Sequence, residues 1–132
     1  MPLSDTMHQI HRLAHQEWSL AARDIGMSFN EFEYLSAVQA EADLLRYEDK
    51  HGQHLQDIVE TLGVTKASAS TMIAKLEVRG LVKRFPCRMD ARAQHIILTD
   101  EGQILMGRGK KIYEKVAASV QAKLGKITLS AP

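Results

Sequence analysis

Apolar residues recur at helical spacing through the first 25 residues of the chain. One falls every three or four positions, at Leu3, Met7, Ile10, Ala14, Trp18, Ala21 and Ile25. This period places them on one face of an amphipathic helix. Gly26 follows, and glycine is typical of the residue that ends a helix because it adopts a left-handed conformation without strain. We predict a first helix over residues 3–26.

A second helix is predicted from Phe29 to about Leu45. Ser28 and Glu31 have the spacing of a capping box, and Met27 with Phe32 has the spacing of a hydrophobic staple. Residues 46–53 show no apolar period and contain a glycine, which predicts an exposed connection, and His51 and His54 are assigned to this loop.

Two short helices follow, separated by a three-residue turn. The apolar positions of the first are Leu55, Ile58, Val59 and Leu62, and those of the second are Ala69, Met72, Ile73 and Leu76. Gly63 is placed to end the first helix, and Thr65 to cap the start of the second. Gly80 is placed to end the second, so the pattern predicts a helix-turn-helix.

After Gly80 the period changes from helical to extended. Residues 81–85 and 95–99 suit two strands, and residues 86–94 between them are polar and basic, which predicts a β-hairpin with a long tip. A last helix over residues 100–125 begins after Thr99, with Asp100 and Glu101 favourable in its first turn. Its apolar stripe contains Leu105, Ile112, Val116, Val120 and Leu124.

Length and composition limit the architecture. A chain of 132 residues fits one compact domain, since such domains bury about two-thirds of the surface that the unfolded chain exposes. Residues 1–132 are therefore predicted to form a single domain. No apolar run approaches the roughly 18 residues of a membrane span. The first residues lack the pattern of a secretory signal, and the single cysteine, Cys87, has no partner for an internal disulfide, so we expect a soluble cytoplasmic protein without a membrane partner.

Charge is distributed unevenly, although the net charge is only +1. Residues 28–63 contain eight acids and two bases, a balance of −6, whereas residues 64–95 contain seven bases and two acids, a balance of +5. A basic segment of this kind is typical of a surface that binds phosphates. It coincides with the predicted helix-turn-helix and hairpin.

The order of elements is that of a winged helix-turn-helix: a mainly α protein with a small β-hairpin, of the α+β class, between long N- and C-terminal helices. In this arrangement the second helix enters the major groove of DNA and the hairpin tip acts as a wing. Residues 55–99 would form the DNA-binding lobe. The candidate DNA-binding residues are Thr65, Lys66, Ser68, Ser70, Thr71, Lys75, Arg84, Arg88 and Arg92.

The chain contains three motifs in order: Leu76-Glu77-Val78-Arg79-Gly80-Leu81-Val82-Lys83-Arg84, Asp90-Ala91-Arg92 and Leu98-Thr99-Asp100-Glu101-Gly102. Their order and spacing resemble those of the MarR (multiple antibiotic resistance regulator) family of transcription factors. The resemblance implies that Arg92 enters the minor groove and that Asp90 holds the wing arginine in place. It also implies a homodimer built from residues 3–26 and 100–125, a near-palindromic operator, repression, and release by a small-molecule effector.

The chain departs from the family pattern at three places. The family often has an arginine at the position of Thr71, so reading of the bases would depend more on Ser68, Ser70 and Lys75. The connection from Glu41 to His54 is longer than usual, and only 30 residues follow Gly102.

Two side-chain groups have a functional and a plainer interpretation. Trp18, Phe29, Phe32 and Tyr34 form a candidate ligand pocket, although aromatics at such positions more often belong to the core. His8, His11 and His15 lie on one side of the first helix at a spacing that suits a metal, but a solvated or interface surface is the more frequent arrangement. No metal site is therefore predicted.

Cys87 lies beside Arg88 in the wing, where positive charge favours a reactive thiolate, although an ordinary reduced surface cysteine is the commoner case. The sequence contains no nucleophile elbow, phosphate-binding glycine loop or paired Cys and His zinc motif, so we predict neither an enzyme nor a cofactor. The prediction is a dimeric repressor that binds double-stranded DNA. The alternative is a winged-helix interaction module, or anti-regulator, that binds a protein instead of DNA.

Overall fold

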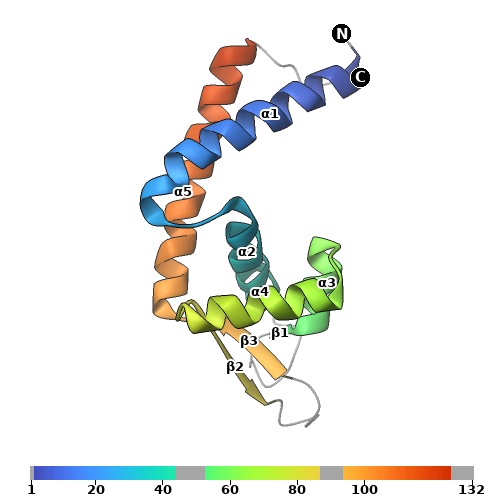
Figure 1. Ribbon diagram of the computed structural model, residues 1–132, viewed down its shortest axis with the longest axis vertical. Helices are drawn as coiled ribbons and strands as arrows, with labels where there is room; N and C mark the ends of the chain where they lie inside the picture. Colours follow the sequence, from blue (N-terminus) through green and yellow to red (C-terminus); the bar gives the residue numbers. More distant parts are fainter. Residues whose placement is uncertain (1, 44–52, 87–93, 126–132) are drawn as a thin grey trace. The chain divides into compact units, whose positions relative to one another are not determined.

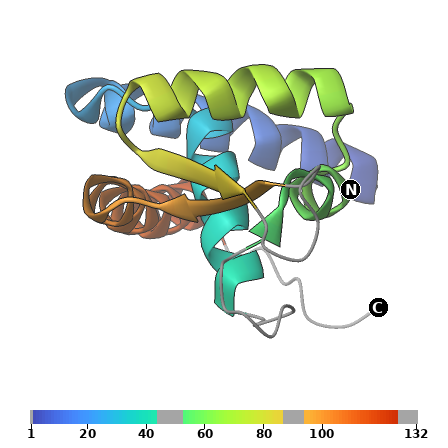
Figure 2. The same cartoon turned by 90° about the horizontal axis from the view of Figure 1, so that it is seen from below.

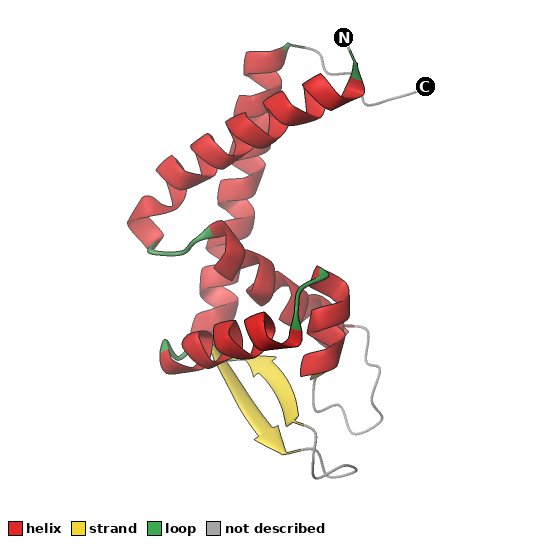
Figure 3. Cartoon of the chain, turned by 45° about the vertical axis from the view of Figure 1, so that its right-hand side comes forward, coloured by secondary structure: helices red, strands yellow, loops and turns green. Residues whose placement is uncertain are grey.

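The computed structural model describes residues 2–43, 53–86 and 94–125 (Figures 1 and 3). The elements, in chain order, are α1 (Leu3–Ala21), the 3₁₀ helix η1 (Ala22–Ile25), α2 (Phe29–Asp43), β1 (Gln53–His54), α3 (Leu55–Leu62), α4 (Lys66–Val78), β2 (Val82–Pro86), β3 (Gln94–Leu98) and α5 (Asp100–Leu124). The chain divides into two compact units, one of Met1–Phe29 with Arg108–Pro132 and one of Asn30–Gly107. The mainly α fold with a hairpin confirms the predicted class.

In the first unit, α1 packs against the later part of α5. Trp18 of α1 is buried, and its ring meets the ring of Phe29 edge to face, with centroids 5.3 Å apart. The ring of Phe29 stacks on Tyr113 of α5 at 5.8 Å, and the Lys123 ammonium donates a hydrogen bond to the Glu17 carboxylate. These contacts join two segments of the unit that lie far apart in the sequence.

The first helix ends earlier as an α-helix than its pattern predicts. Residues 22–25, predicted as part of it, form the tighter 3₁₀ turn η1, which is common at helix ends. Gly26 then adopts a φ of +63°, so the predicted terminating glycine is confirmed. The second helix begins at Phe29 as predicted, and its expected last residues, 44 and 45, lie outside the described residues.

In the second unit, α3 and α4 pack on each other across the predicted turn. Gly63 has a φ of +66° and its N–H donates to the Val59 carbonyl oxygen over 2.9 Å, which ends α3. Thr65 then caps α4, because its Oγ1 accepts a hydrogen bond from the Ser68 N–H over 3.1 Å. Both predictions are confirmed.

The sheet has three antiparallel strands in the order β1-β3-β2. The two strands of the hairpin run side by side in Figure 2, and in their register Val82 pairs with Leu98 and Pro86 with Gln94. Each strand is displaced by one residue from the prediction, because Leu81 donates its N–H to the Leu76 carbonyl oxygen at the end of α4 and Thr99 caps α5.

The loop assignment of His54 is wrong, as is the extension of the connection to Gln53. These two residues form β1, in which Gln53 pairs with Ile96 and His54 with His95. The His54 ring lies 4.6 Å from the buried His95 ring, which also stacks on Phe85 at 5.5 Å. Pairing with β3 therefore gives Gln53 and His54 their extended conformation, although their sequence shows no alternation of apolar residues.

The core of the second unit brings helices and sheet together. Its fully buried apolar side chains include Leu35, Val38, Ile58, Ala69, Ile73 and Leu76, each with no measurable exposure, and Val82 and Ile96 of the sheet are nearly as buried. Figure 2 shows α4 running beside the hairpin, and α4 contacts β2. This packing fixes which face of α4 remains open to solvent.

Candidate nucleic-acid interface

The two faces of α4 differ sharply in chemistry. Ala69, Ile73 and Leu76 are buried, whereas the polar residues predicted to bind DNA are exposed: Thr65, Lys66, Ser68, Ser70, Thr71 and Lys75. Short hydroxyl side chains on a helix surface allow close approach of another molecule and can donate to or accept from base edges or phosphates. The structure therefore places these six predicted residues together on one accessible helix.

The start of α4 suits an anion. The first turn contains no acidic residue and begins with Lys66, so the positive end of the helix dipole is not offset locally. Backbone N–H groups at such a terminus bind phosphate oxygens in many proteins. The Thr65 hydroxyl, which also donates to Ser68 Oγ over 2.9 Å, holds the local geometry of this end.

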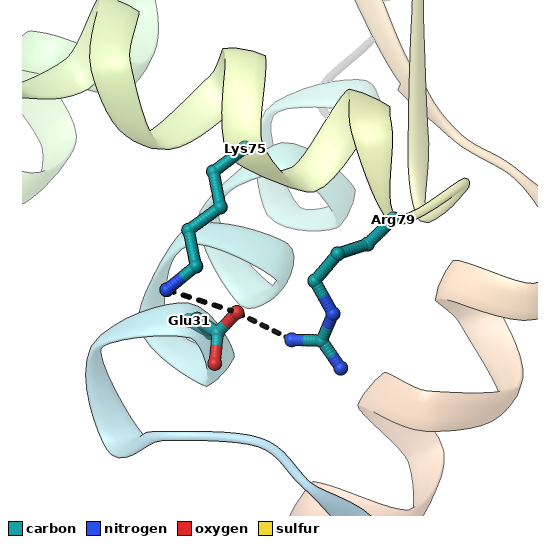
Figure 4. Close-up of polar contacts among 3 residues, drawn as sticks. All are labelled: Glu31, Lys75 and Arg79. Atoms are coloured by element: carbon teal, nitrogen blue, oxygen red, sulfur yellow. Dashed lines mark hydrogen bonds and ion pairs between the residues drawn. The ribbon is translucent and has the colours of Figure 1, made fainter.

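The other end of α4 is anchored by charge. Glu31 of α2 is buried, with 4% of its surface exposed, and its Oε2 accepts a hydrogen bond from Nη1 of Arg79 (Figure 4). The Lys75 ammonium lies 3.8 Å from the same oxygen. Lys75, predicted to contact DNA, thus has an acidic partner within the protein.

Sequence reasoning missed Glu31 as a residue of this site. It assigned Glu31 to a local capping box with Ser28, because an acid three residues after a serine has that spacing. The pairing with Arg79 joins residues 48 positions apart, and no spacing rule signals such a contact. The sequence signal nearest to it is the position of Glu31 between the apolar residues Phe29 and Phe32.

Arg84 of β2 is engaged in a similar way. Its Nη2 donates to Oε1 of Glu77 over 2.8 Å and its Nε to the same oxygen over 3.3 Å. The hydrogen bond from Arg84 lowers the pKa of the Glu77 carboxyl below its ordinary value. This pair connects the hairpin to α4. The Glu77 carboxylate partly offsets the positive charge of Arg84, which weakens the attraction of Arg84 for phosphates.

The wing residues lie outside the described part of the chain. Arg88, Asp90 and Arg92 fall between the end of β2 at Pro86 and the start of β3 at Gln94, and so does Cys87. Their predicted roles therefore stay predictions. The two strands that carry this segment are in place as an antiparallel pair.

Of the four aromatics in the candidate ligand pocket, the structure brings two to one pocket. Trp18 and Phe29 line a pocket of about 310 Å³ in the first unit, with His15, Arg23 and Ser28 among its other lining residues. Phe32 and Tyr34 are buried in the second unit and do not line this pocket, and burial raises the pKa of the Tyr34 hydroxyl.

The histidine row of α1 is exposed. His8, His11 and His15 lie on the helix surface, and the Arg12 guanidinium lies 3.4 Å from Nε2 of His8. Within residues 2–43, 53–86 and 94–125, no three His, Cys, Asp or Glu side chains group closely enough to hold a metal ion. Likewise, no helix in these ranges has the length and apolar character that crossing a membrane requires.

A helix, a short turn, a second helix with an exposed polar face, and a hairpin packed beside it define the winged helix-turn-helix class of proteins. The sequence model of the MarR family matches residues 25–93, a segment that contains α3, α4 and β2, and the chain belongs to that family. The predicted resemblance to the MarR family is thereby confirmed.

Solved structures share this fold across most of the chain. The crystal structure of apo MarR from E. coli superposes with a TM-score of 0.76 at 15% identity, covering 93% of this chain and 85% of that one. The S. aureus MepR–DNA complex gives a TM-score of 0.75 at 20% identity, covering 96% and 87%. The transcriptional repressor CouR bound to a 23-mer DNA duplex gives 0.77 at 22% identity, covering 94% and 82%. No curated protein matches the chain significantly in sequence.

Proposed function

We propose that this chain is a sequence-specific DNA-binding transcription regulator that represses its targets as a homodimer on a near-palindromic operator. The observation that carries the proposal is the capped α4 helix, whose exposed face holds Lys66, Ser68, Ser70 and Thr71 while its other face is buried. In this class such a helix enters the major groove. MepR and CouR, which share the fold, both have solved structures in complex with DNA.

The wing completes the proposed interface. Arg88 and Arg92 lie in the segment between β2 and β3, and an arginine on a projecting loop matches the negative potential of a narrow minor groove. Asp90, two residues before Arg92, is proposed to orient it. The activity proposed is DNA binding in the cytoplasm, and it requires no catalytic group or cofactor.

The dimer and the effector belong to the same proposal. Exposed apolar residues of α1, together with an apolar groove of about 310 Å³ between α1 and α5, support pairing of two chains through these helices. Two recognition helices would then lie about 34–36 Å apart, one turn of DNA. The pocket lined by Trp18, Phe29 and Arg23 supports a small effector with an aromatic or anionic group.

Replacing Arg92 with alanine tests the DNA-binding proposal. The operator is first recovered by selecting bound fragments from random duplex DNA, and affinities are then measured at several salt concentrations. Arg92→Ala is expected to weaken operator binding by about tenfold or more while the circular dichroism spectrum stays unchanged. Arg108→Ala, which removes an exposed arginine of α5, is the matched control. Unchanged affinity in Arg92→Ala would contradict the wing's role.

A protein-interaction module is the second candidate. It is favoured by the acidic partners of three basic residues near the proposed interface: Glu31 pairs with Arg79 and Lys75, and Glu77 pairs with Arg84. The selection experiment separates the two functions. DNA binding predicts recovery of a palindrome and an affinity that falls steeply with salt, whereas the interaction module predicts that no duplex is enriched.

A further inference from the structure

Glu31 joins α2 to the end of the proposed recognition helix. It lies in the first turn of α2. One of its two carboxylate oxygens, Oε2, faces both the Arg79 guanidinium and the Lys75 ammonium (Figure 4). Lys75 belongs to the last turn of α4 and Arg79 is its C-terminal cap residue. One buried carboxylate therefore holds two cations of the same helix.

The burial of Glu31 makes its contact with Arg79 costly to break. A carboxylate removed from water keeps its charge only when it is paired and hydrogen-bonded, so separating Arg79 from Glu31 would remove the hydrogen-bonded one of its two cationic partners. The planar guanidinium restricts the angle at which Arg79 can approach. The position of Glu31 at the positive end of α2 adds further stabilisation to its charged form.

The anchored residues share a helix face with residues proposed to read DNA. Ser68, Thr71, Lys75 and Arg79 follow the i, i+3, i+7 and i+11 spacing of one face, and all four are exposed. A rotation of α4 about its axis would displace the hydroxyls at its start and the cations at its end together. The contact with Glu31 opposes such a rotation at one end of this face.

We propose that Glu31 is a positioning residue for sequence reading, an inference that rests on the proposed function of α4. Glu31 does not touch DNA. Its carboxylate fixes the rotation of α4 through Arg79, and it reduces the freedom of Lys75 and Arg79 to bind phosphates in registers unrelated to the bases. Contacts to bases depend on fixed geometry, whereas non-specific binding depends mainly on available positive charge.

The variant Glu31→Gln tests this role in the full chain. It keeps the size of the side chain and removes its charge. Affinity is measured for the selected operator duplex and for a duplex of the same length and composition with scrambled sequence. We expect operator affinity to fall by about tenfold, the loss of one base contact, and affinity for the scrambled duplex to stay constant or rise. Hydrogen exchange of the free protein should become faster in the last turns of α4.

Glu33→Gln is the matched control, because it removes the same charge from another face of α2. It should leave both affinities and the exchange of α4 unchanged. If Glu31→Gln does not fold, Glu31→Asp takes its place, since the shorter side chain keeps the charge but moves it away from Arg79. The same changes in operator affinity and in hydrogen exchange of α4 are then expected, with smaller magnitudes.

The possible outcomes distinguish a failure of the positioning role of Glu31 from a failure of the proposed DNA-binding function. Equal losses on both duplexes, an unchanged operator affinity or unchanged exchange in α4 would overturn the positioning role while the wild-type chain still binds its operator. Failure of the wild-type chain to enrich any duplex would overturn the proposed function, and the positioning role with it.

Discussion

Gly102, in the first turn of α5, lies against the backbone of Leu81. A Cβ built at this glycine would stand 2.1 Å from the Leu81 carbonyl oxygen. That oxygen accepts a hydrogen bond from the Thr99 N–H over 3.0 Å, and Thr99 Oγ1 donates to the Gly80 carbonyl oxygen over 2.6 Å. Because the neighbouring atom is part of a hydrogen-bonded backbone, it cannot yield as a flexible side chain would.

Gly102→Ala is therefore expected to destabilise the protein by about 2 kcal/mol or more, the range for forcing an extra methyl group into a packed site. Urea unfolding followed by circular dichroism measures the difference. Gly107→Ala is the control in the same helix, since a Cβ there meets nothing within 4 Å. It should raise stability by up to about 1 kcal/mol through helix propensity. Equal stability of the two variants would contradict the close approach at Leu81.

At the scale of elements, the Glu77–Arg84 pair joins α4 to β2. The two side chains are 40% and 28% exposed, so solvent screens their interaction. Hydrogen bonding from Arg84 lowers the pKa of the Glu77 carboxyl in the folded chain. A lowered pKa in the folded state means that the pair stabilises the protein above the ordinary glutamate pKa of 4.5 and that this contribution disappears as the pH falls through the lowered value.

Arg84→Gln should thus reduce the free energy of unfolding near neutral pH by less than about 1 kcal/mol, as surface ion pairs are weak. It should also flatten the decline of stability with acidification, measured by urea unfolding from about pH 7 to about pH 3. Lys83→Gln removes an equal charge from the exposed side of β2 and serves as the control. An acid decline in Arg84→Gln as steep as in the wild-type chain would count against the pair.

At the scale of the whole molecule, exposed apolar side chains favour association. Leu3, Met7 and Leu20 of α1 are 67%, 47% and 63% exposed in the single chain. The neighbouring groove of about 310 Å³ is lined mostly by apolar residues, among them Ile10, Val116 and Val120. Covering such surfaces removes apolar area from water, which is the main driving force of association.

The chain of 14.8 kDa is accordingly expected to have twice that mass in solution, measured by light scattering at micromolar concentration. Met7→Lys should shift this equilibrium toward the monomer and weaken operator binding, because a lysine would place its charge in the apolar contact. Gln9→Lys adds the same charge at an exposed polar position of α1 and should leave the dimer intact. A monomeric wild-type chain would rule out the proposed dimer.

The charge pattern also has a different meaning once the whole molecule is known. The sequence places Glu31 in the acidic segment of residues 28–63, apart from the basic segment of residues 64–95. In the structure that carboxylate is buried and compensated by Arg79 and Lys75. The acidic and basic segments are thus partly neutralised against each other inside the second unit.

Local features followed from the sequence by itself. The periods of apolar residues predicted α1 to α5 and the hairpin, and the terminating glycines at 26, 63 and 80 all have positive φ values. The cap by Thr65 and the start of the last helix after Thr99 were likewise predicted. These interactions join residues within a few positions of each other, so the spacing of residue types is enough to specify them.

Contacts between distant segments were decided by the tertiary structure alone. Strand β1 exists because His54 pairs with His95, and the space at Gly102 is set by Leu81. The buried carboxylate of Glu31 has a hydrogen-bond donor because Arg79 lies against it. Each of these contacts depends on how helices and strands pack. The two residues of each contact lie far apart in the sequence, and their separation follows no regular spacing. The sequence therefore determined the elements and the family, whereas packing determined how the proposed recognition helix is held.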